Sequence, residues 1–215
     1  MDYLKLCHSI PSATQNKSFE KNGYLYLPKL IGDCENIRCP PPVDSQGKRL
    51  VGQYSFYGKN KFKYTSEEGQ VEGSLARYNI PVYKRVHRLI GKSIENVLGI
   101  DVFPTYFYDR FYYLGQELKP HSDRPACEIS VTLQVSSTSN KPWPIWFELP
   151  DNSVEYVNMN DGDGVIYRGC DRIHWRHPLK GDKDVYHHQI FFHYVNAQGP
   201  FVHYAFDRKP NSNEI

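Results

Sequence analysis

The chain has 215 residues, of which 40% are hydrophobic and 23% are charged, and its formal net charge is +2. These values are those of one ordinary globular domain, and they exclude a disordered chain and a strongly basic nucleic-acid-binding domain. Five cysteines at irregular spacing exclude a disulfide framework, and no apolar run approaches the roughly 18 residues of a spanning helix.

The first eight residues, Met1 to His8, contain neither the basic nor the apolar segment of a secretory signal. We therefore expect a cytoplasmic protein in a reducing compartment, without membrane association. Residues 1–60 are expected to be irregular with short helices or strands. Within them, the run Cys39-Pro40-Pro41-Pro42 is expected to be a rigid extended connector. The segment Phe62–Thr65 is a candidate strand.

A helix is predicted from about Leu75 to Leu98, because apolar residues recur there at spacings of three and four. Pro81 suits the first turn of a helix, and Gly99 is a plausible C-terminal cap. The repeating apolar residues are Val82, Val86, Leu89, Ile90, Ile94 and Leu98. We expect residues 1–100 to form a helical and irregular extension that packs on the core of a single structural domain.

Residues 101–207 have the composition of a β-rich core, because β-branched and aromatic runs alternate with turn-forming residues. This pattern predicts a mainly β fold with flanking helices, of the sandwich or jelly-roll kind. The residues 208–215 are expected to be a loose tail. The predicted strands are Val102–Tyr113, Glu128–Ser136, Trp143–Leu149, Gly164–Tyr167, Arg172–His174 and Tyr186–Asn196.

His121-Ser122-Asp123 is the most informative motif in the chain. On a strand, residues i and i+2 point to the same side, so His121 and Asp123 would converge on one metal ion. Together with a second histidine they would form the 2-His-1-carboxylate triad of non-haem iron(II) oxygenases, which leaves open positions on the metal. His174 and His177 are the two candidates for the third ligand.

These motifs and their flanks resemble the 2-oxoglutarate- and iron(II)-dependent oxygenases, particularly the prolyl-4-hydroxylase-like branch. That branch shows a tyrosine and a glycine before H-x-D, here Tyr112 and Gly115, then a glycine-aspartate pair, here Gly162-Asp163, and a histidine four residues before a proline. The resemblance covers roughly residues 101–197. A closer similarity to phage-encoded members of the family is indicated by Asp123-Arg124-Pro125 and His174-Trp175-Arg176, and it implies no substrate.

The resemblance implies a double-stranded β-helix, which is a jelly roll, with iron(II) held by His121, Asp123 and His174. It also implies conversion of 2-oxoglutarate and dioxygen to succinate and carbon dioxide, coupled to hydroxylation of a substrate C–H bond. Ascorbate would help to keep the iron reduced. The carboxylate of Asp123 favours hydroxylation over halogenation, because halogenases vacate that position for the halide.

The 2-oxoglutarate carboxylate that points into the barrel requires a cationic partner, since a buried charge must be paired. Three residues are candidates for this clamp. Lys183 has the spacing of the family, His187 takes its place if the final strand is displaced, and Arg176 shares a strand face with His174. We favour Arg176 slightly. Tyr112, Arg110 and Gln134 are further candidates for lining the co-substrate pocket.

The substrate cannot be read from the motifs. Prolyl hydroxylation in a peptide or protein is the expectation from the family branch, and a small-molecule substrate is the alternative; no nucleic-acid partner is expected. The basic and aromatic stretch from Gly58 to Tyr64 is a candidate flank of a substrate site, or else a solvated edge. The non-enzymatic rival is a cupin-like metal-binding or sensor domain without turnover.

Overall fold

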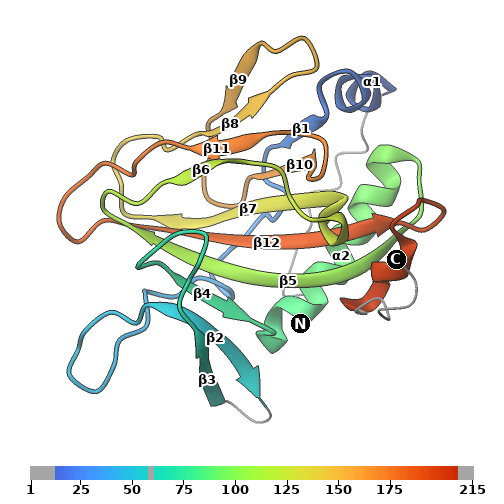
Figure 1. Cartoon of the computed structure of the whole chain (residues 1–215). Helices are drawn as coiled ribbons and strands as arrows, with labels where there is room; N and C mark the ends of the chain where they lie inside the picture. Colours follow the sequence, from blue (N-terminus) through green and yellow to red (C-terminus); the bar gives the residue numbers. More distant parts are fainter. Residues whose placement is uncertain (1–12, 58–60, 208–215) are drawn as a thin grey trace.

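The computed structural model describes residues 13–57 and 61–207, so the predicted loose tail lies outside the described residues. The chain is mainly β, as predicted, and most of its strands form two sheets (Figure 1). Along the chain the helices and strands are α1 (Ala13–Asn22), β1 (Tyr24–Leu27), β2 (Gly52–Tyr57), β3 (Lys61–Ser66), β4 (Leu75–Tyr78), α2 (Pro81–Leu98), β5 (Val102–Tyr113), β6 (Leu118–His121), η1 (Pro125–Cys127), β7 (Ile129–Ser137), β8 (Ile145–Glu148), β9 (Val154–Val157), β10 (Gly164–Arg168), β11 (His174–Arg176), β12 (Tyr186–Asn196) and η2 (Val202–Asp207).

The large sheet has eight strands in the order β1-β10-β7-β12-β5-β4-β2-β3, and the small sheet has four in the order β6-β11-β8-β9. All neighbouring pairs are antiparallel except β2 and β4, which are parallel. The small sheet lies over one face of the large sheet (Figure 1). This arrangement confirms the predicted jelly-roll core.

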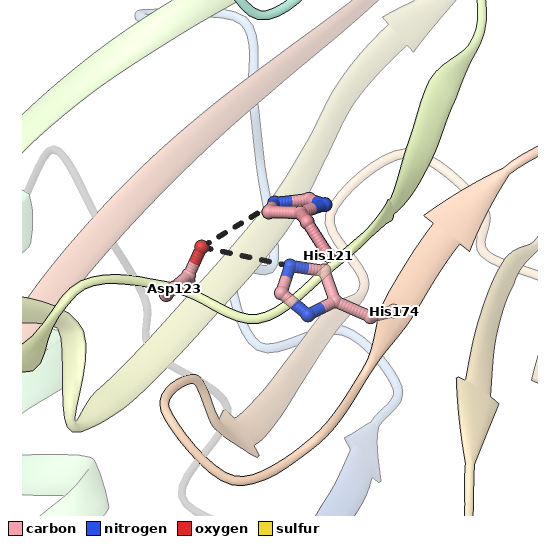
Figure 2. Close-up of side chains that lie close together, drawn as sticks. All are labelled: His121, Asp123 and His174. Atoms are coloured by element: carbon pink, nitrogen blue, oxygen red, sulfur yellow. Dashed lines mark ion pairs between the residues drawn. The ribbon is translucent and has the colours of Figure 1, made fainter.

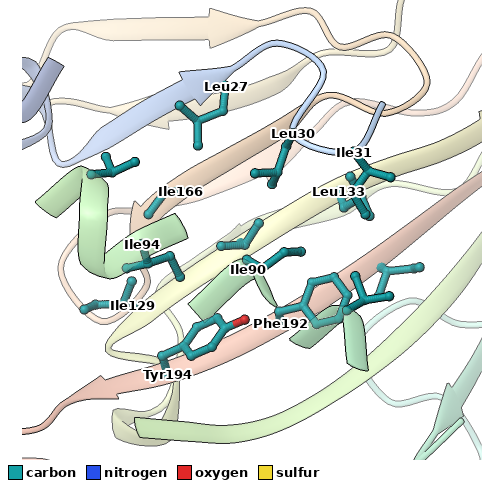
Figure 3. Packing of buried hydrophobic residues seen from close by; sticks show 14 of the residues in the cluster. Leu27, Leu30, Ile31, Ile90, Ile94, Ile129, Leu133, Ile166, Phe192 and Tyr194 are labelled. Atoms are coloured by element: carbon teal, nitrogen blue, oxygen red, sulfur yellow. The ribbon is translucent and has the colours of Figure 1, made fainter. Parts of the chain in front are cut away.

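Helix α2 packs against the face of the large sheet that points away from the small sheet. Its buried residues Ile90 and Ile94 join Leu133 of β7 and Phe192 of β12 in one apolar cluster (Figure 3). Gly99 ends the helix in the left-handed conformation, with φ of 69°, and its N–H donates to the Glu95 carbonyl at 2.8 Å. The predicted C-terminal cap is therefore confirmed.

The helix begins at Pro81, so the predicted start at Leu75 is wrong. Residues Leu75–Tyr78 form strand β4 instead, between β2 and β5. The apolar and aromatic side chains of this segment fit both a helix and a short strand, and the pairing with β5 decides between them. Four strands from before residue 101 also belong to the large sheet, so the region packs into the core sheet itself.

The other strand predictions are close. β12 has the predicted bounds, whereas β11 covers His174–Arg176 rather than Arg172–His174. Strand β9 was not predicted, and β6 was not predicted as a separate strand; each has four residues. Among the described residues, no helix combines the length and apolar character required to cross a membrane.

Strand β12 separates two environments by simple alternation. Ile190 and Phe192 face the α2 side and belong to its apolar cluster. The alternate residues His187, Gln189 and His193 are also buried, but they face the space between the two sheets. The interior of the jelly roll is therefore lined by polar side chains, which an ordinary structural core would avoid.

Candidate metal centre

Two neighbouring strands of the small sheet hold the predicted triad. His121 is the last residue of β6, His174 is the first residue of β11, and the two are direct register partners. Asp123 lies in the loop after β6, so the expectation that it shares a strand with His121 is wrong (Figure 2). The loop nevertheless turns the carboxylate back toward both imidazoles.

The three side chains converge on a common point. The Asp123 Oδ1 atom lies 3.5 Å from His121 Nε2 and 3.7 Å from His174 Nε2 (Figure 2). One ligand atom from each residue lies within 4.8 Å of the others. Two imidazole nitrogens and one carboxylate oxygen are a donor set suited to a divalent transition metal, and they occupy only one side of it.

Both imidazoles are oriented by backbone carbonyls. His121 Nδ1 lies 2.8 Å from the Lys119 carbonyl oxygen, and His174 Nδ1 lies 3.0 Å from that of Arg172. A hydrogen on Nδ1 satisfies each carbonyl and leaves the lone pair on Nε2, the atom that faces Asp123. Such outer hydrogen bonds fix the tautomer of metal-binding histidines. The geometry therefore fits a metal ion at this position.

Asp123 is held independently of the histidines. Its N–H donates to the Gly169 carbonyl at 2.8 Å, and Ser130 Oγ donates to Oδ2 at 3.1 Å. Burial would raise the pKa of Asp123, but in the metal-free protein a protonated His121, which donates from Nε2, and the neighbouring imidazoles outweigh burial and lower the pKa. The carboxylate is therefore ionised, as a metal ligand must be.

The close approach of Asp123 to the β10–β11 turn requires a glycine at position 169. A Cβ atom at this position would lie 2.2 Å from the Cys127 carbonyl oxygen and 2.7 Å from Asp123 Oδ2. Both distances are shorter than real Cβ contacts, so any larger residue would displace the backbone or the ligand carboxylate.

A second group of possible ligands shares Asp123. The ligand atoms of Asp123, Cys127 and His193 also lie within 4.8 Å of one another. Here, however, the Cys127 thiol contacts the Tyr106 hydroxyl at 3.1 Å, and burial raises its pKa to about 12. A protonated thiol is a poor ligand, so the triad with two histidines is the better site.

His177, the alternative ligand, lies outside both groups. Its side chain is exposed and contacts Trp146 with a ring separation of 5.1 Å, on the outer side of the small sheet. The alternation along β11 explains this, since His174 and Arg176 point inward and the intervening Trp175 does not.

Arg176 is a buried cation without an acidic partner among the described residues. Its side chain is 1% exposed. Nη1 donates to the Trp143 carbonyl at 2.5 Å, and the guanidinium lies over the Trp143 ring at 4.8 Å. Burial lowers the pKa of Arg176 to about 10, which still leaves it charged at neutral pH. A buried charge of this kind calls for a bound anion.

The other two clamp candidates are placed differently. Lys183 lies on an exposed turn before β12, away from the interior. His187 is buried in the interior beside Trp143, at a ring separation of 4.8 Å. Burial lowers the pKa of His187 well below its usual value, so it is neutral and supplies no charge to a carboxylate.

Tyr112, Arg110 and Gln134 all lie in the interior. Tyr112 is fully buried, and its ring meets the Trp143 ring edge-on at 4.9 Å. Gln134 Nε2 donates to Asp161 Oδ1 at 3.2 Å. Arg110 differs from Arg176, because its charge is already neutralised by Glu68 at 3.0 Å.

The segment between β3 and β4 approaches the metal ligands, which the sequence analysis missed. Gln70 Oε1 accepts a hydrogen bond from Arg110 Nη1 at 2.8 Å, and Gln70 Nε2 lies 2.8 Å from His121 Nε2. Ser130 and His193, which contact each other at 2.9 Å behind Asp123, were also missed as a supporting pair. The alternation of polar residues along β12 was the available signal for His193.

A cavity of about 530 Å³ opens at the other end of the jelly-roll interior, between the loops after β7 and β9. Gln134, Trp143, Met159 and His187 contribute to its lining. Met159 Sδ also lies 3.8 Å from Arg176 Nη2. Arg176 is therefore situated between this cavity and the triad.

No protein-family model and no curated protein matches the chain. Solved structures do match it in fold. A 2OG-Fe(II) oxygenase family oxidoreductase from Burkholderia pseudomallei has a TM-score of 0.61 at 12% identity, over 95% of this chain and 97% of that one. A prolyl-4-hydroxylase from Pseudomonas putida has a TM-score of 0.55 at 11% identity, over 86% of this chain and 98% of that one.

A third structure carries ligands. HygX from Streptomyces hygroscopicus, with nickel, 2-oxoglutarate and hygromycin B bound, has a TM-score of 0.60 at 12% identity, over 87% of this chain and 88% of that one. These likenesses confirm the predicted resemblance at the level of the fold. One of these structures is a prolyl-4-hydroxylase and another has hygromycin B bound, so the fold alone leaves the substrate open.

Proposed function

We propose that the chain is an iron(II)- and 2-oxoglutarate-dependent dioxygenase that hydroxylates a C–H bond of its substrate. The observation that carries the proposal is the convergence of His121 Nε2, His174 Nε2 and an ionised Asp123 on one point of the interior. The overall reaction would take the substrate, 2-oxoglutarate and dioxygen to the hydroxylated substrate, succinate and carbon dioxide.

The metal, when bound, would supply the redox chemistry, and the protein would supply position and charge. His121, Asp123 and His174 would hold the ion on one side and leave the other side open. Arg176 would bind the far carboxylate of 2-oxoglutarate, since two residues along β11 span roughly 7 Å, which matches the length of this short diacid. Tyr112, Gln134 and His187 would line the same pocket and exclude water. Ascorbate would act only as an external reductant.

The substrate belongs to the proposal only in its general class. A peptide or protein, with proline as the first candidate residue, follows from the resemblance to prolyl-4-hydroxylases, and a small molecule is the second candidate. The acidic ligand Asp123 supports hydroxylation, because an aspartate occupies the position that a halide would need.

The decisive experiment separates turnover from simple binding. The protein is loaded with iron(II) and 2-oxoglutarate without oxygen, air is admitted, and succinate is measured. We expect slow formation of succinate even without substrate, whereas a sensor domain would bind the metal and form none. Absence of both succinate and 2-oxoglutarate binding in iron-loaded protein would refute the proposal.

The ligand assignment has its own matched control. His121→Ala, Asp123→Ala and His174→Ala should each abolish iron binding, measured by metal analysis after gel filtration. His177→Ala removes a nearby exposed imidazole and should keep both the metal and succinate formation. Loss of metal from His177→Ala but not from His174→Ala would reverse the assignment.

A further inference from the structure

The large sheet extends beyond the small sheet at the β4-β2-β3 end (Figure 1). The segment between β3 and β4 turns from this end toward Arg110 and His121, and Ser55 and Tyr78 stay half-buried. We call the inward-facing residues Tyr78, Ser55, Tyr57, Lys61 and Lys63 the β3 shelf. Lys61 and Lys63 are exposed, and Tyr57 is 57% exposed. None of the five residues is acidic.

A continuous row of side chains connects the β3 shelf to the metal centre. Lys63 is the register partner of Ser55, Ser55 of Tyr78, and Tyr78 of Tyr108. Register partners on neighbouring strands point to the same face. The ring of Tyr78 stacks on that of Tyr108 at 4.9 Å, and the ring of Tyr108 lies 5.9 Å from that of His193. His193 contacts Ser130, whose hydroxyl donates to Asp123.

The opposite face carries different side chains, and it is buried only at β4 and β5. Phe56 and Phe62 pack edge-on at 4.6 Å, and Arg77 forms a buried ion pair with Asp109. The shelf lysines therefore point away from this packing, toward the side on which the substrate would approach the triad. Arg124 adds a third cation near the row, over the ring of Tyr106 at 4.4 Å.

We propose that the β3 shelf binds the acidic flank of an extended peptide substrate whose reacting residue lies at the metal centre. This inference rests on the proposed oxygenase function and specifies its substrate class. The tyrosines would form an apolar floor under the peptide, while Lys61 and Lys63 would pair with its carboxylates.

The spacing of the strands sets the position of the acidic residue. Three interstrand steps separate Tyr108 from Lys63, which amounts to about 14 Å. An extended peptide advances roughly 3.4 Å per residue, and the metal centre lies beyond Tyr108, so the carboxylate should stand at least about four residues from the reacting one. A small substrate could not reach both places at once.

Charged residues on an edge strand also prevent sheet-to-sheet aggregation, and that role would explain the lysines without any ligand. The two explanations differ in whether the sign of the charge matters. Edge protection is satisfied by charge of either sign, whereas a carboxylate-binding shelf requires positive charge. Charge reversal at these positions therefore tests the proposal without removing the protective charge.

The experiment measures binding of labelled nonapeptides by fluorescence anisotropy to protein loaded with iron(II) and 2-oxoglutarate without oxygen. Each peptide has proline at its centre, serine and glycine around it, and glutamate, glutamine or lysine at both ends. We expect the glutamate peptide to bind roughly three- to thirtyfold more tightly than the glutamine peptide at low salt, and the difference to shrink near 0.5 M salt.

The double variant Lys61→Glu, Lys63→Glu should invert the preference, so that the lysine peptide binds best. The matched control is Lys84→Glu, Lys92→Glu, which makes the same change of total charge on exposed positions of α2, across the large sheet. The control should keep the preference for glutamate.

Equal binding of the glutamate and glutamine peptides, or equal losses in the two double variants, would overturn the inference. Displacement of the glutamate peptide by a short single-stranded oligonucleotide at a lower concentration than by unlabelled peptide would overturn the choice of partner. The proposed function is tested separately. If iron-loaded protein prefers the acidic peptide but forms no succinate in air, the inference about the β3 shelf stands and the proposed oxygenase function is wrong.

Discussion

At the scale of single residues, Arg176 distinguishes this interior from an ordinary protein core. It is buried, charged and without an acidic partner among the described residues, whereas the nearby Arg110 is neutralised by Glu68. A fully desolvated guanidinium costs several kcal/mol unless an anion pairs with it. The protein would recover this cost on binding a carboxylate.

Replacement of Arg176 by methionine should therefore weaken binding of 2-oxoglutarate. A charge-assisted hydrogen bond contributes roughly 1.5–3 kcal/mol, so the dissociation constant should rise about ten- to a hundredfold. Titration of 2-oxoglutarate into iron-loaded protein without oxygen would measure it. Lys183→Met, on an exposed turn, is the control and should change 2-oxoglutarate binding little. If Lys183→Met binds 2-oxoglutarate weakly and Arg176→Met binds it normally, the clamp is Lys183. Iron binding should survive both changes.

Gly169→Ala should lower metal affinity although it replaces none of the three ligand residues. The added Cβ would push on the Cys127 carbonyl and on Asp123 Oδ2, so the carboxylate must move. We expect at least a tenfold weaker affinity for iron(II) or cobalt(II), with an altered cobalt absorption spectrum. Gly69→Ala is the control, since a Cβ there meets nothing within 4 Å. An unchanged cobalt spectrum in Gly169→Ala would mean that the turn adapts.

At the scale of elements, the segment between β3 and β4 is fixed to the barrel by one buried ion pair. Glu68 and Arg110 are 4% and 2% exposed, and Gln70, two residues later, contacts both Arg110 and His121. The segment thus connects the edge of the large sheet to the metal centre.

Glu68→Gln should loosen this segment, because it leaves Arg110 as an uncompensated buried cation. Breaking a buried pair costs on the order of 3 kcal/mol, and urea unfolding would measure the change. Hydrogen exchange should rise first in residues 67–74. Glu67→Gln, at an exposed position, is the control and should behave as wild type. Equal stability of Glu68→Gln and wild type would show that Arg110 finds another partner.

The elements also show what could be predicted from the sequence. The α2 apolar repeat, the turn residues and the β12 alternation are local patterns, and they fixed most of the strands and the class of fold. The start of α2 could not be predicted, because Leu75–Tyr78 becomes a strand only through its pairing with β2 and β5. Gln70 and Glu68 were missed for the same reason, since their partners lie about forty residues away.

At the scale of the whole molecule, stability should fall steeply in mild acid. Burial lowers the pKa of His87 to about 4 and that of His193 to about 3. The unfolded chain binds these protons near pH 6.5 and the folded one does not, so unfolding takes up protons below pH 6.5. Each such histidine reduces the free energy of unfolding by about 1.4 kcal/mol per pH unit, from about 6.5 down to the folded pKa.

His87→Gln isolates one of these contributions, because the glutamine amide can still donate to the His193 carbonyl that His87 contacts at 3.0 Å. Urea unfolding of metal-free protein between pH 7.5 and 4.5 should give a slope smaller by about 1.4 kcal/mol per pH unit than in wild type. Equal slopes would show that His87 is protonated in the folded protein.

The cavity near Arg176 has a consequence for the order of events in the proposed reaction. Gln134 of β7 lines the cavity, whereas Ser130 of the same strand bonds to Asp123 at the metal centre. Gln134 lies four residues after Ser130, which is roughly 13 Å along a strand. The cavity and the metal centre thus lie at different ends of the jelly roll. A co-substrate could enter and its product leave at the cavity end while a peptide still occupies the metal end. Steady-state kinetics would then follow a random sequence, and a slowly dissociating peptide would undergo several rounds of hydroxylation before release.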